Sequence, residues 1–170
     1  MGGSAPPTPD PSTWTFPRLR ITREGEWIHD GEEVTHPGIL ANLRDNLRVD
    51  EQGYYMQIGP ARVPVEVDDA PYVVIRVEVE NDRLVLTLND LAREVLALET
   101  LSLGADGVPR CQVKSGHFPA RLNRAAAYQL LQHVQIDEAA GAATLVIGTV
   151  RRTIPMPPPQ SERSQAEREI

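Results

Sequence analysis

The segment LRDNLRVDEQGYYMQIGPARVPV, residues 43–65, has a close counterpart in LLQHVQIDEAAGAATLVIGTVRRTIP, residues 130–155. The apolar positions and the Asp-Glu pair that follows them repeat at an interval of 87 residues. Two extra residues in the later turn restore the alignment at a glycine and an arginine further on. Each copy reads as a helix end, an acidic turn and two strands, which predicts a duplicated α+β fold. Chance similarity between short amphipathic segments is the alternative.

The length and the prolines suggest how the chain is organised. Its 170 residues are enough for one ordinary domain or two very small ones. Prolines gather at both ends, where apolar side chains are too few to offset the entropy of folding. We therefore predict disordered tails at residues 1–17 and 156–170. Between them we predict a first repeat at residues 18–88 and a second at residues 89–155, each an antiparallel sheet with one helix, with a concave seam between the halves.

Three segments carry the clearest local patterns. The residues of HPGILANLRDNLRV predict a helix with one apolar face made of Ile39, Leu40, Leu43 and Leu47. The residues of LNRAAAYQLLQHV predict a second helix, capped by Asn123, whose apolar face comprises Tyr128, Leu131 and Val134. Between them, VVIRVEVENDRLVLTL predicts a hairpin that bends at Asn81 and Asp82.

Composition argues against several classes of function. The net charge is −7, and 17 basic residues are scattered among 24 acidic ones, which argues against a nucleic-acid binder. No apolar run is long enough to span a membrane, and the start lacks the pattern of a signal peptide. The single cysteine cannot form an internal disulfide, which suits a reducing compartment. We expect a cytoplasmic protein that acts neither on nucleic acid nor on membranes.

No motif in the sequence predicts an enzyme. The four histidines, His29, His36, His117 and His133, have no metal-ligand spacing, so neither a metal site nor a cofactor is expected. Cys111 and His117 could act as nucleophile and base, but a buried core thiol is the favoured interpretation. The nucleophile elbow, the dinucleotide fingerprint and the phosphate-binding loop of nucleotide hydrolases do not occur.

Two adjacent carboxylates interrupt the apolar run VEVDDAPYVV, residues 65–74. Asp68 and Asp69 could bind a metal, divide acid and base roles, or turn the chain between two strands. No further carboxylates lie nearby at a spacing typical of a metal site. An aspartate two residues before Pro71, able to bind backbone N–H groups, favours a sharp corner.

Basic and aromatic residues offer a candidate anion site. Arg121 and Arg124 flank the start of the second predicted helix, where the free N–H groups and the helix dipole favour an anion. Guanidinium groups bind phosphate in a bidentate manner. A solvated helix edge is the alternative for these arginines. Trp27 and Tyr72 could stack against a base, although aromatic residues in alternating strands are more often core.

Three motifs together resemble the bacterial family known as domain of unknown function 1285. They are GEWIHDGEEVTHPGILANLRDNL, GYYMQIGPARVPVEVDDAPYVV and PARLNRAAAYQLL, and the corner VDDAPYV is the most specific part. The positions that match the family pattern are Trp27, Gly31, Asp69, Pro71, Tyr72 and Arg124. The sequence departs from the pattern at His36, Gly59 and Arg62. These departures bear on whether any ligand of the family is shared.

The resemblance implies a duplicated two-domain fold whose second half is loosely similar to pleckstrin-homology barrels. It also implies a nucleotide-like ligand between the halves and a role in signalling, without an established activity. We therefore predict a ligand-binding or signalling module for a phosphorylated small molecule, contacted by Trp27, Asp69, Tyr72, Arg121 and Arg124. The alternative is a scaffold that docks a protein partner through a strand edge or a helix face. Convergence of the two arginines and an aromatic residue on one enclosed cavity would favour the ligand-binding hypothesis over the docking hypothesis.

Overall fold

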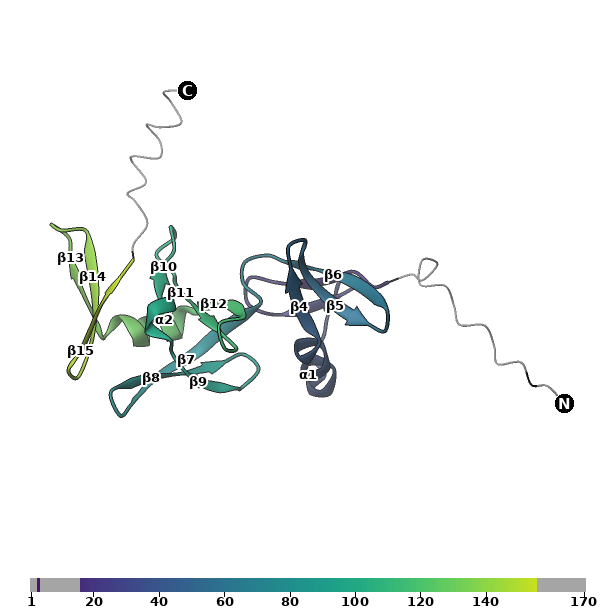
Figure 1. The fold of residues 1–170 in the computed structure, drawn as a ribbon, viewed down its shortest axis with the longest axis horizontal. Coiled ribbons are helices and arrows are strands. Elements are labelled where there is room, and N and C mark those ends of the chain that lie inside the picture. Colours follow the sequence, from purple (N-terminus) through teal and green to yellow (C-terminus); the bar gives the residue numbers. More distant parts are fainter. Residues whose placement is uncertain (1–2, 4–15, 156–170) are drawn as a thin grey trace, which may run out of the picture. The chain divides into compact units, whose positions relative to one another are not determined.

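The computed structural model describes residue 3 and residues 16–155, and the chain divides into two compact units between Asp68 and Asp69 (Figure 1). Apart from residues 3, 16 and 17, the predicted tails at residues 1–17 and 156–170 lie outside the described residues. The predicted division after residue 88 differs from the observed one. The reason is that Val77, Leu84 and Leu86 of the predicted hairpin belong to the core of the second unit.

The first unit is one six-stranded sheet with a helix. Its elements are β1 (Leu19–Ile21), β2 (Trp27–His29), β3 (Glu32–Glu33), α1 (Pro37–Asp45), β4 (Leu47–Asp50), β5 (Gly53–Ile58) and β6 (Ala61–Val67). The strand order is β3-β2-β1-β6-β5-β4, and β1 pairs with β6 in parallel while the other pairs are antiparallel. Alternation along the strands buries Leu19, Ile21, Trp27, Val63 and Val65 in one core.

The second unit has two sheets and a helix. Its first elements are β7 (Tyr72–Glu80), β8 (Arg83–Leu88), β9 (Arg93–Val95), a 3-10 turn η2 (Leu98–Thr100), β10 (Ser102–Leu103), β11 (Pro109–Val113) and β12 (Phe118–Leu122). They are followed by α2 (Arg124–Leu131), β13 (Val134–Asp137), β14 (Ala142–Ile147) and β15 (Val150–Ile154). The larger sheet has the order β10-β11-β12-β7-β8-β9, and the smaller is the meander β13-β14-β15. The pairing of β7 with β12 is parallel.

Both units share one order of elements: three antiparallel strands, a helix and three more antiparallel strands. The first copy runs from β1 to β6 and the second from β10 to β15, and the turn before β14 holds the two extra residues that the sequence predicts. The parallel β1–β6 pairing has a counterpart in the Leu103 N–H, which donates to the Pro155 carbonyl at 3.1 Å. The predicted α+β class and duplication are confirmed. The pleckstrin-homology-like character of the second half stays a prediction.

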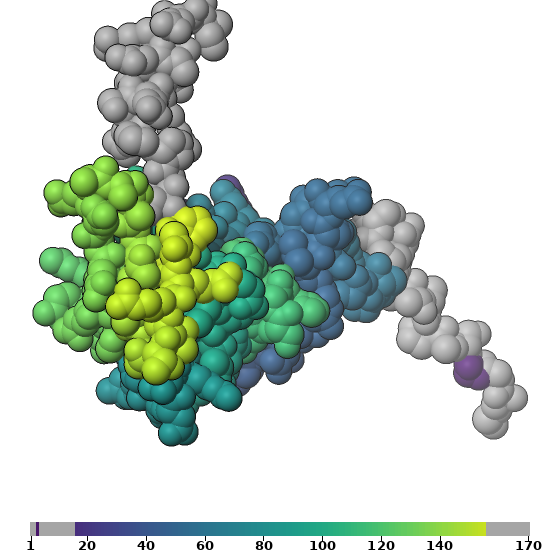
Figure 2. Space-filling view, turned by 60° about the vertical axis from the view of Figure 1, so that its left-hand side comes forward, coloured from purple at the N-terminus to yellow at the C-terminus, as the bar shows by residue number. Residues whose placement is uncertain are grey.

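Strands β7, β8 and β9 precede the second copy and have no counterpart among the described residues of the first unit. The predicted bend is confirmed, since Asn81 and Asp82 have positive φ angles of 51° and 59°. This bend meets the turn between β14 and β15, because a Cβ atom added to Gly148 would lie 2.5 Å from the Asp82 carboxylate. The space-filling view shows the C-terminal strands, green to yellow, beside the teal β7–β9 region of the same unit (Figure 2).

The predicted apolar faces of both helices are partly wrong. Helix α1 ends at Asp45, so Leu47 is the buried first residue of β4 instead of part of the helix. In α2 the buried residues are Ala126 and Leu130, whereas Tyr128 is 69% exposed. The reason is that α2 turns toward β7, where the Gln129 side-chain oxygen accepts the Val77 N–H at 2.7 Å.

Candidate functional site

The two aspartates of the predicted corner form hydrogen bonds with different units, Asp68 with the first and Asp69 with the second. Asp68 accepts the Nε–H of Arg20 on β1, with 2.9 Å between Nε and Oδ1. This hydrogen bond lowers the pKa of the Asp68 carboxyl and raises the pKa of Arg20. Asp69 instead accepts hydrogen bonds from Arg110 on β11 in the second unit. The corner interpretation is therefore supported by contacts on both sides of the division.

Asp69 lies beside two arginines on neighbouring strands. Arg110 and Arg121 are direct cross-strand partners in the β11–β12 pair. Both terminal nitrogens of Arg110 donate to Asp69, with 3.1 Å between Nη2 and Oδ2. The Arg121 Nε lies 3.7 Å from the same Oδ2, and the side chains of Arg121 and Asp69 are only 14% and 17% exposed. The hydrogen bond to Asp69 raises the pKa of Arg110, so this guanidinium keeps its charge at neutral pH.

A cavity of about 350 Å³ lies against the start of α2. Arg121 on β12 and Arg124, the first residue of α2, both line it. Most of the remaining lining is apolar, and it comprises Val108, Pro109, Leu122, Ala127, Tyr128 and Leu131. One carboxylate, that of Asp106, stands at this cavity, which leaves an excess of positive charge among its lining residues.

Local sequence explains why these residues meet. Asn123 caps α2, as predicted, because its side-chain oxygen accepts the Ala126 N–H at 2.8 Å. The cap starts the helix directly after β12 and so places Arg124 close to the strand that carries Arg121. One helical turn later, Tyr128 stands on the same side as Arg124, since residues four positions apart share a helix face.

The predicted site residues thus divide into two groups. Arg121 and Arg124 line one cavity, and Asp69 contacts Arg121 from beside it. Trp27, by contrast, is 1% exposed in the core of the first unit. Tyr72 is 3% exposed in the core of the second, where its ring lies 5.5 Å from that of Phe118 and 5.2 Å from the Lys114 ammonium. The structure therefore assigns both aromatic residues to cores, which was the alternative interpretation.

Sequence reasoning missed Arg110 and Tyr128. Arg110 joins the cluster only through the β11–β12 register, which no local pattern reveals. Tyr128 was assigned to the buried helix face, although its ring is exposed at the cavity. An aromatic residue four positions after an arginine at a capped helix start is the signal that could have located it.

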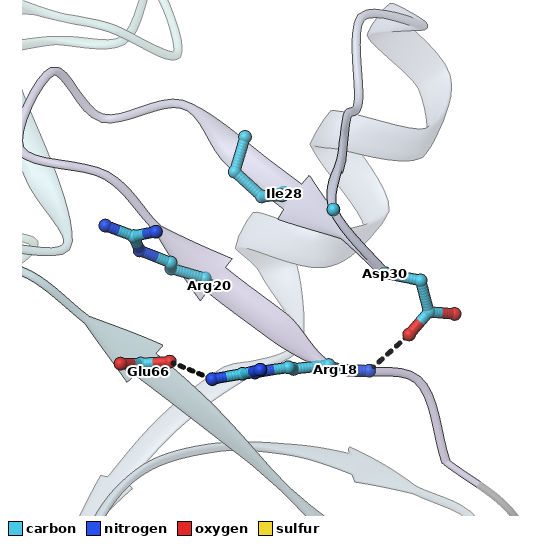
Figure 3. A pocket seen from close by; sticks show the side chains of 6 residues that line it. Arg18, Arg20, Ile28, Asp30 and Glu66 are labelled. Atoms are coloured by element: carbon cyan, nitrogen blue, oxygen red, sulfur yellow. Dashed lines mark hydrogen bonds and ion pairs between the residues drawn. The ribbon is translucent and has the colours of Figure 1, made fainter.

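A second cavity, of about 500 Å³, lies on the first unit (Figure 3). Arg18 and Arg20 line it beside Asp30 and Glu66, and the Arg18 N–H donates to Asp30 at 2.8 Å. The Arg18 guanidinium reaches toward Glu66, 3.7 Å away, and these side chains are 84% and 57% exposed. Such surface pairs are weak, and the cavity carries equal numbers of basic and acidic residues. Its lining therefore has no excess of positive charge to favour an anion.

A third cavity, of about 530 Å³, is also charge-balanced. It lies in the second unit between the β7–β8 bend and the β14–β15 turn, with Arg83 and Arg152 offset by Asp82 and Glu99. Among the three cavities described, only the one at α2 combines an excess of arginine with an exposed aromatic ring.

Cys111 is not suited to nucleophilic chemistry. The side chain is 2% exposed on β11, and burial, helped by the charge of Glu94, raises the pKa of the thiol to about 12. The reactive thiolate is therefore scarce at neutral pH. Within residues 16–155, no group of three or more His, Cys, Asp or Glu side chains is arranged to hold a metal ion. Neither described helix has the length and apolar character needed to cross a membrane.

A model of one protein family, described as "Protein of unknown function (DUF2946)", matches residues 12–167. The chain belongs to this family. No curated protein matches this member of the DUF2946 family.

Two solved structures resemble this DUF2946 family member. A DUF1285 family protein from Silicibacter pomeroyi DSS-3 has a TM-score of 0.64 and 23% identity, over 95% of this chain and 92% of that one. A DUF1285 family protein from Shewanella baltica OS155 has a TM-score of 0.58 and 18% identity, over 68% of this chain and 91% of that one. The predicted resemblance is thus confirmed at the level of the fold. These descriptions name neither a ligand nor an activity.

Proposed function

We propose that the second unit binds a small phosphorylated molecule, such as a nucleotide, in the cavity at α2. The observation that carries this proposal is the convergence of Arg121, Arg124 and Tyr128 on one cavity of about 350 Å³. This volume falls within the range of about 300 to 1,000 Å³ that is usual for small-molecule sites. All of these residues belong to the second unit, so the proposal requires nothing from the first.

The chemistry of the lining supports a phosphorylated ligand with an apolar or aromatic part. The two guanidinium groups supply directed donors and charge for phosphate oxygens. Tyr128, 69% exposed, offers a ring face for a base or another flat group, and Leu131 extends the apolar surface. The lining of this cavity contains one carboxylate, that of Asp106, and no His, Cys, Ser, Thr or Lys. The proposed role is ligand sensing in the cytoplasm, with the bound state as the signal.

The proposal is tested by calorimetric titration of the full chain with pyrophosphate, AMP and ADP. We expect at least one of them to bind, and the Arg124→Ala variant to bind at least tenfold more weakly, since a charged hydrogen bond contributes about 1.5 to 3 kcal/mol. Arg151→Ala is the matched control, because Arg151 is an exposed arginine of the same unit on β15 and lies outside this cavity. Absence of binding, or equal weakening by both variants, would contradict the proposal.

A protein-docking function is the second candidate. Exposed apolar side chains favour it, because Tyr128, Leu131 and Ile136 are 69%, 38% and 60% exposed around and beyond α2. A docked protein would depend on the Tyr128 ring and little on Arg124. Binding of a partner that Tyr128→Ala abolishes and Arg124→Ala leaves unchanged, in a chain that ignores all three phosphate compounds, would favour docking.

A further inference from the structure

The carboxylate of Asp69 forms an ion pair with an arginine that also lines the cavity at α2. It accepts from both terminal nitrogens of Arg110, and one of its oxygens lies 3.7 Å from the Arg121 Nε. Arg121 is also a lining residue of the cavity at α2. Arg121 therefore lies between two anionic groups, the Asp69 carboxylate on one side and the proposed ligand on the other.

We infer that Asp69 is an internal competitor for the ligand, whose phosphate displaces the Asp69 carboxylate from Arg121. This inference rests on the proposed function of the α2 cavity. Carboxylate and phosphate both pair with guanidinium groups, so the Asp69 carboxylate and a ligand phosphate compete for the charge of Arg121. Phosphate carries more charge and more acceptor oxygens than a carboxylate, which allows the exchange. The released Asp69 would keep Arg110 as its partner.

The position of Asp69 gives the exchange a consequence for the backbone. It is the first residue of the second unit, and Asp68 directly before it is held by Arg20. Loss of one of the two arginine contacts of Asp69 loosens the chain at the division between the units. Ligand binding in the cavity would thereby increase the backbone mobility of the corner at Asp68 and Asp69. A signalling module requires such a conformational response to its ligand.

The test compares three carboxylate variants of the full chain in titrations with pyrophosphate. Asp69→Asn removes the competing charge at nearly constant shape, and we expect binding to tighten by roughly tenfold. Asp68→Asn makes the same change at the next residue, which pairs with Arg20, and should leave the affinity unchanged. Asp106→Asn removes a carboxylate from the cavity itself, 3.5 Å from Arg110, and should have a smaller effect than Asp69→Asn.

The outcomes separate this inference from the proposed function. Unchanged or weaker binding by Asp69→Asn overturns the competition and leaves the function standing. Equal tightening by Asp106→Asn also overturns it, because a general charge effect would then suffice. If neither the wild type nor Asp69→Asn binds any probe, both ideas fail. Binding by Asp69→Asn alone supports both, since the competitor then masks the site.

A measurement on the wild type covers the case in which Asp69→Asn does not fold. In NMR titrations with pyrophosphate, the Nε–Hε signals of Arg110 and Arg121 and the backbone amides of Asp69 and Ala70 should shift with the signals of the cavity. Saturation of the cavity without any change at Asp69 and Arg110 would overturn the inference.

Discussion

Helices α1 and α2 occupy equivalent places in the two copies, yet only α2 contains fully buried residues. Their caps, His36 and Asn123, lie 87 positions apart, and both accept the N–H three residues later. Helix α1 nevertheless buries none of its residues, whereas α2 buries Ala126 and Leu130 completely. The difference follows from β7, an element of the second unit alone, against which α2 lies. The presence of β7, more than the sequence of the helix, therefore determines how deeply the helix is buried.

The same comparison locates the candidate site in one copy. At the 87-residue interval, Arg121, Arg124 and Tyr128 correspond to Val34, Pro37 and Ala41. The first copy thus has neither the cations nor the ring at the equivalent helix start. The two copies therefore share the frame, and the proposed binding residues are present in the second copy alone among the described residues.

The largest expected effect comes from truncating the equivalent leucines Leu130 and Leu43. Leu130 is fully buried, so Leu130→Ala should lower the free energy of unfolding by about 2 to 5 kcal/mol. Leu43 is only partly buried, so Leu43→Ala should cost about 1 kcal/mol or less. Urea denaturation followed by circular dichroism measures both. Tryptophan fluorescence isolates the first unit, because Trp14 and Trp27 both precede Asp69. Equal losses of unfolding free energy in the two variants would contradict the difference in burial between the two helices.

An intermediate effect is expected at the equivalent glycines Gly59 and Gly148. Their φ angles are +56° and +55°, so alanine at either position should cost about 1 kcal/mol through the backbone alone. A Cβ atom at Gly59 meets nothing within 4 Å, whereas at Gly148 it would collide with the Asp82 carboxylate. Gly148→Ala should therefore lower the unfolding midpoint further than Gly59→Ala.

Addition of Asp82→Ala tests the origin of that difference. Because Asp82 itself has a φ of 59°, the reference is the Asp82→Ala single variant. In that background, Gly148→Ala should cost no more than Gly59→Ala does in the wild type. A Gly148→Ala variant as stable as Gly59→Ala would show that the two hairpin turns of the second unit are not in contact.

The smallest effect concerns an exposed ion pair of the first copy. Arg62 donates to Asp50 at 2.8 Å, and this hydrogen bond lowers the pKa of the Asp50 carboxyl from its ordinary value. A lowered pKa in the folded state stabilises the protein above the ordinary value, and this stability is lost as the pH falls through the lowered pKa. Asp50→Asn should therefore slightly flatten the fall in unfolding free energy below about pH 4. Arg62→Gln should do the same, and an unchanged slope in that variant would exclude the pair as the cause.

How much of the fold the sequence predicts depends on how far apart the interacting residues lie along the chain. The repeat, the Asn123 cap and the bend at Asn81 and Asp82 rest on neighbouring residues, and these predictions are confirmed. The buried face of α2 was predicted wrongly because AAAYQLL offers two apolar faces, and β7 decides between them. The parallel β7–β12 pairing has no local signal, so the division of the chain was misplaced.

The candidate site follows the same rule. Arg121 and Arg124 were accessible to reasoning because a helix start lies between them. The partnership of Asp69 with Arg110 spans 41 positions and needs the strand register to become visible. Trp27 and Tyr72 were assigned to a ligand because a matching motif does not reveal whether a ring faces a core or a cavity.

The opposite attachments of Asp68 and Asp69 bear on how this family member can evolve. Junctions between compact units are usually the places where insertions and deletions accumulate without harm. Here one peptide bond separates a carboxylate held by Arg20 from a carboxylate held by Arg110. An added or missing residue would pull one of them away from its arginine. This junction should therefore tolerate changes of residue type more readily than changes of length.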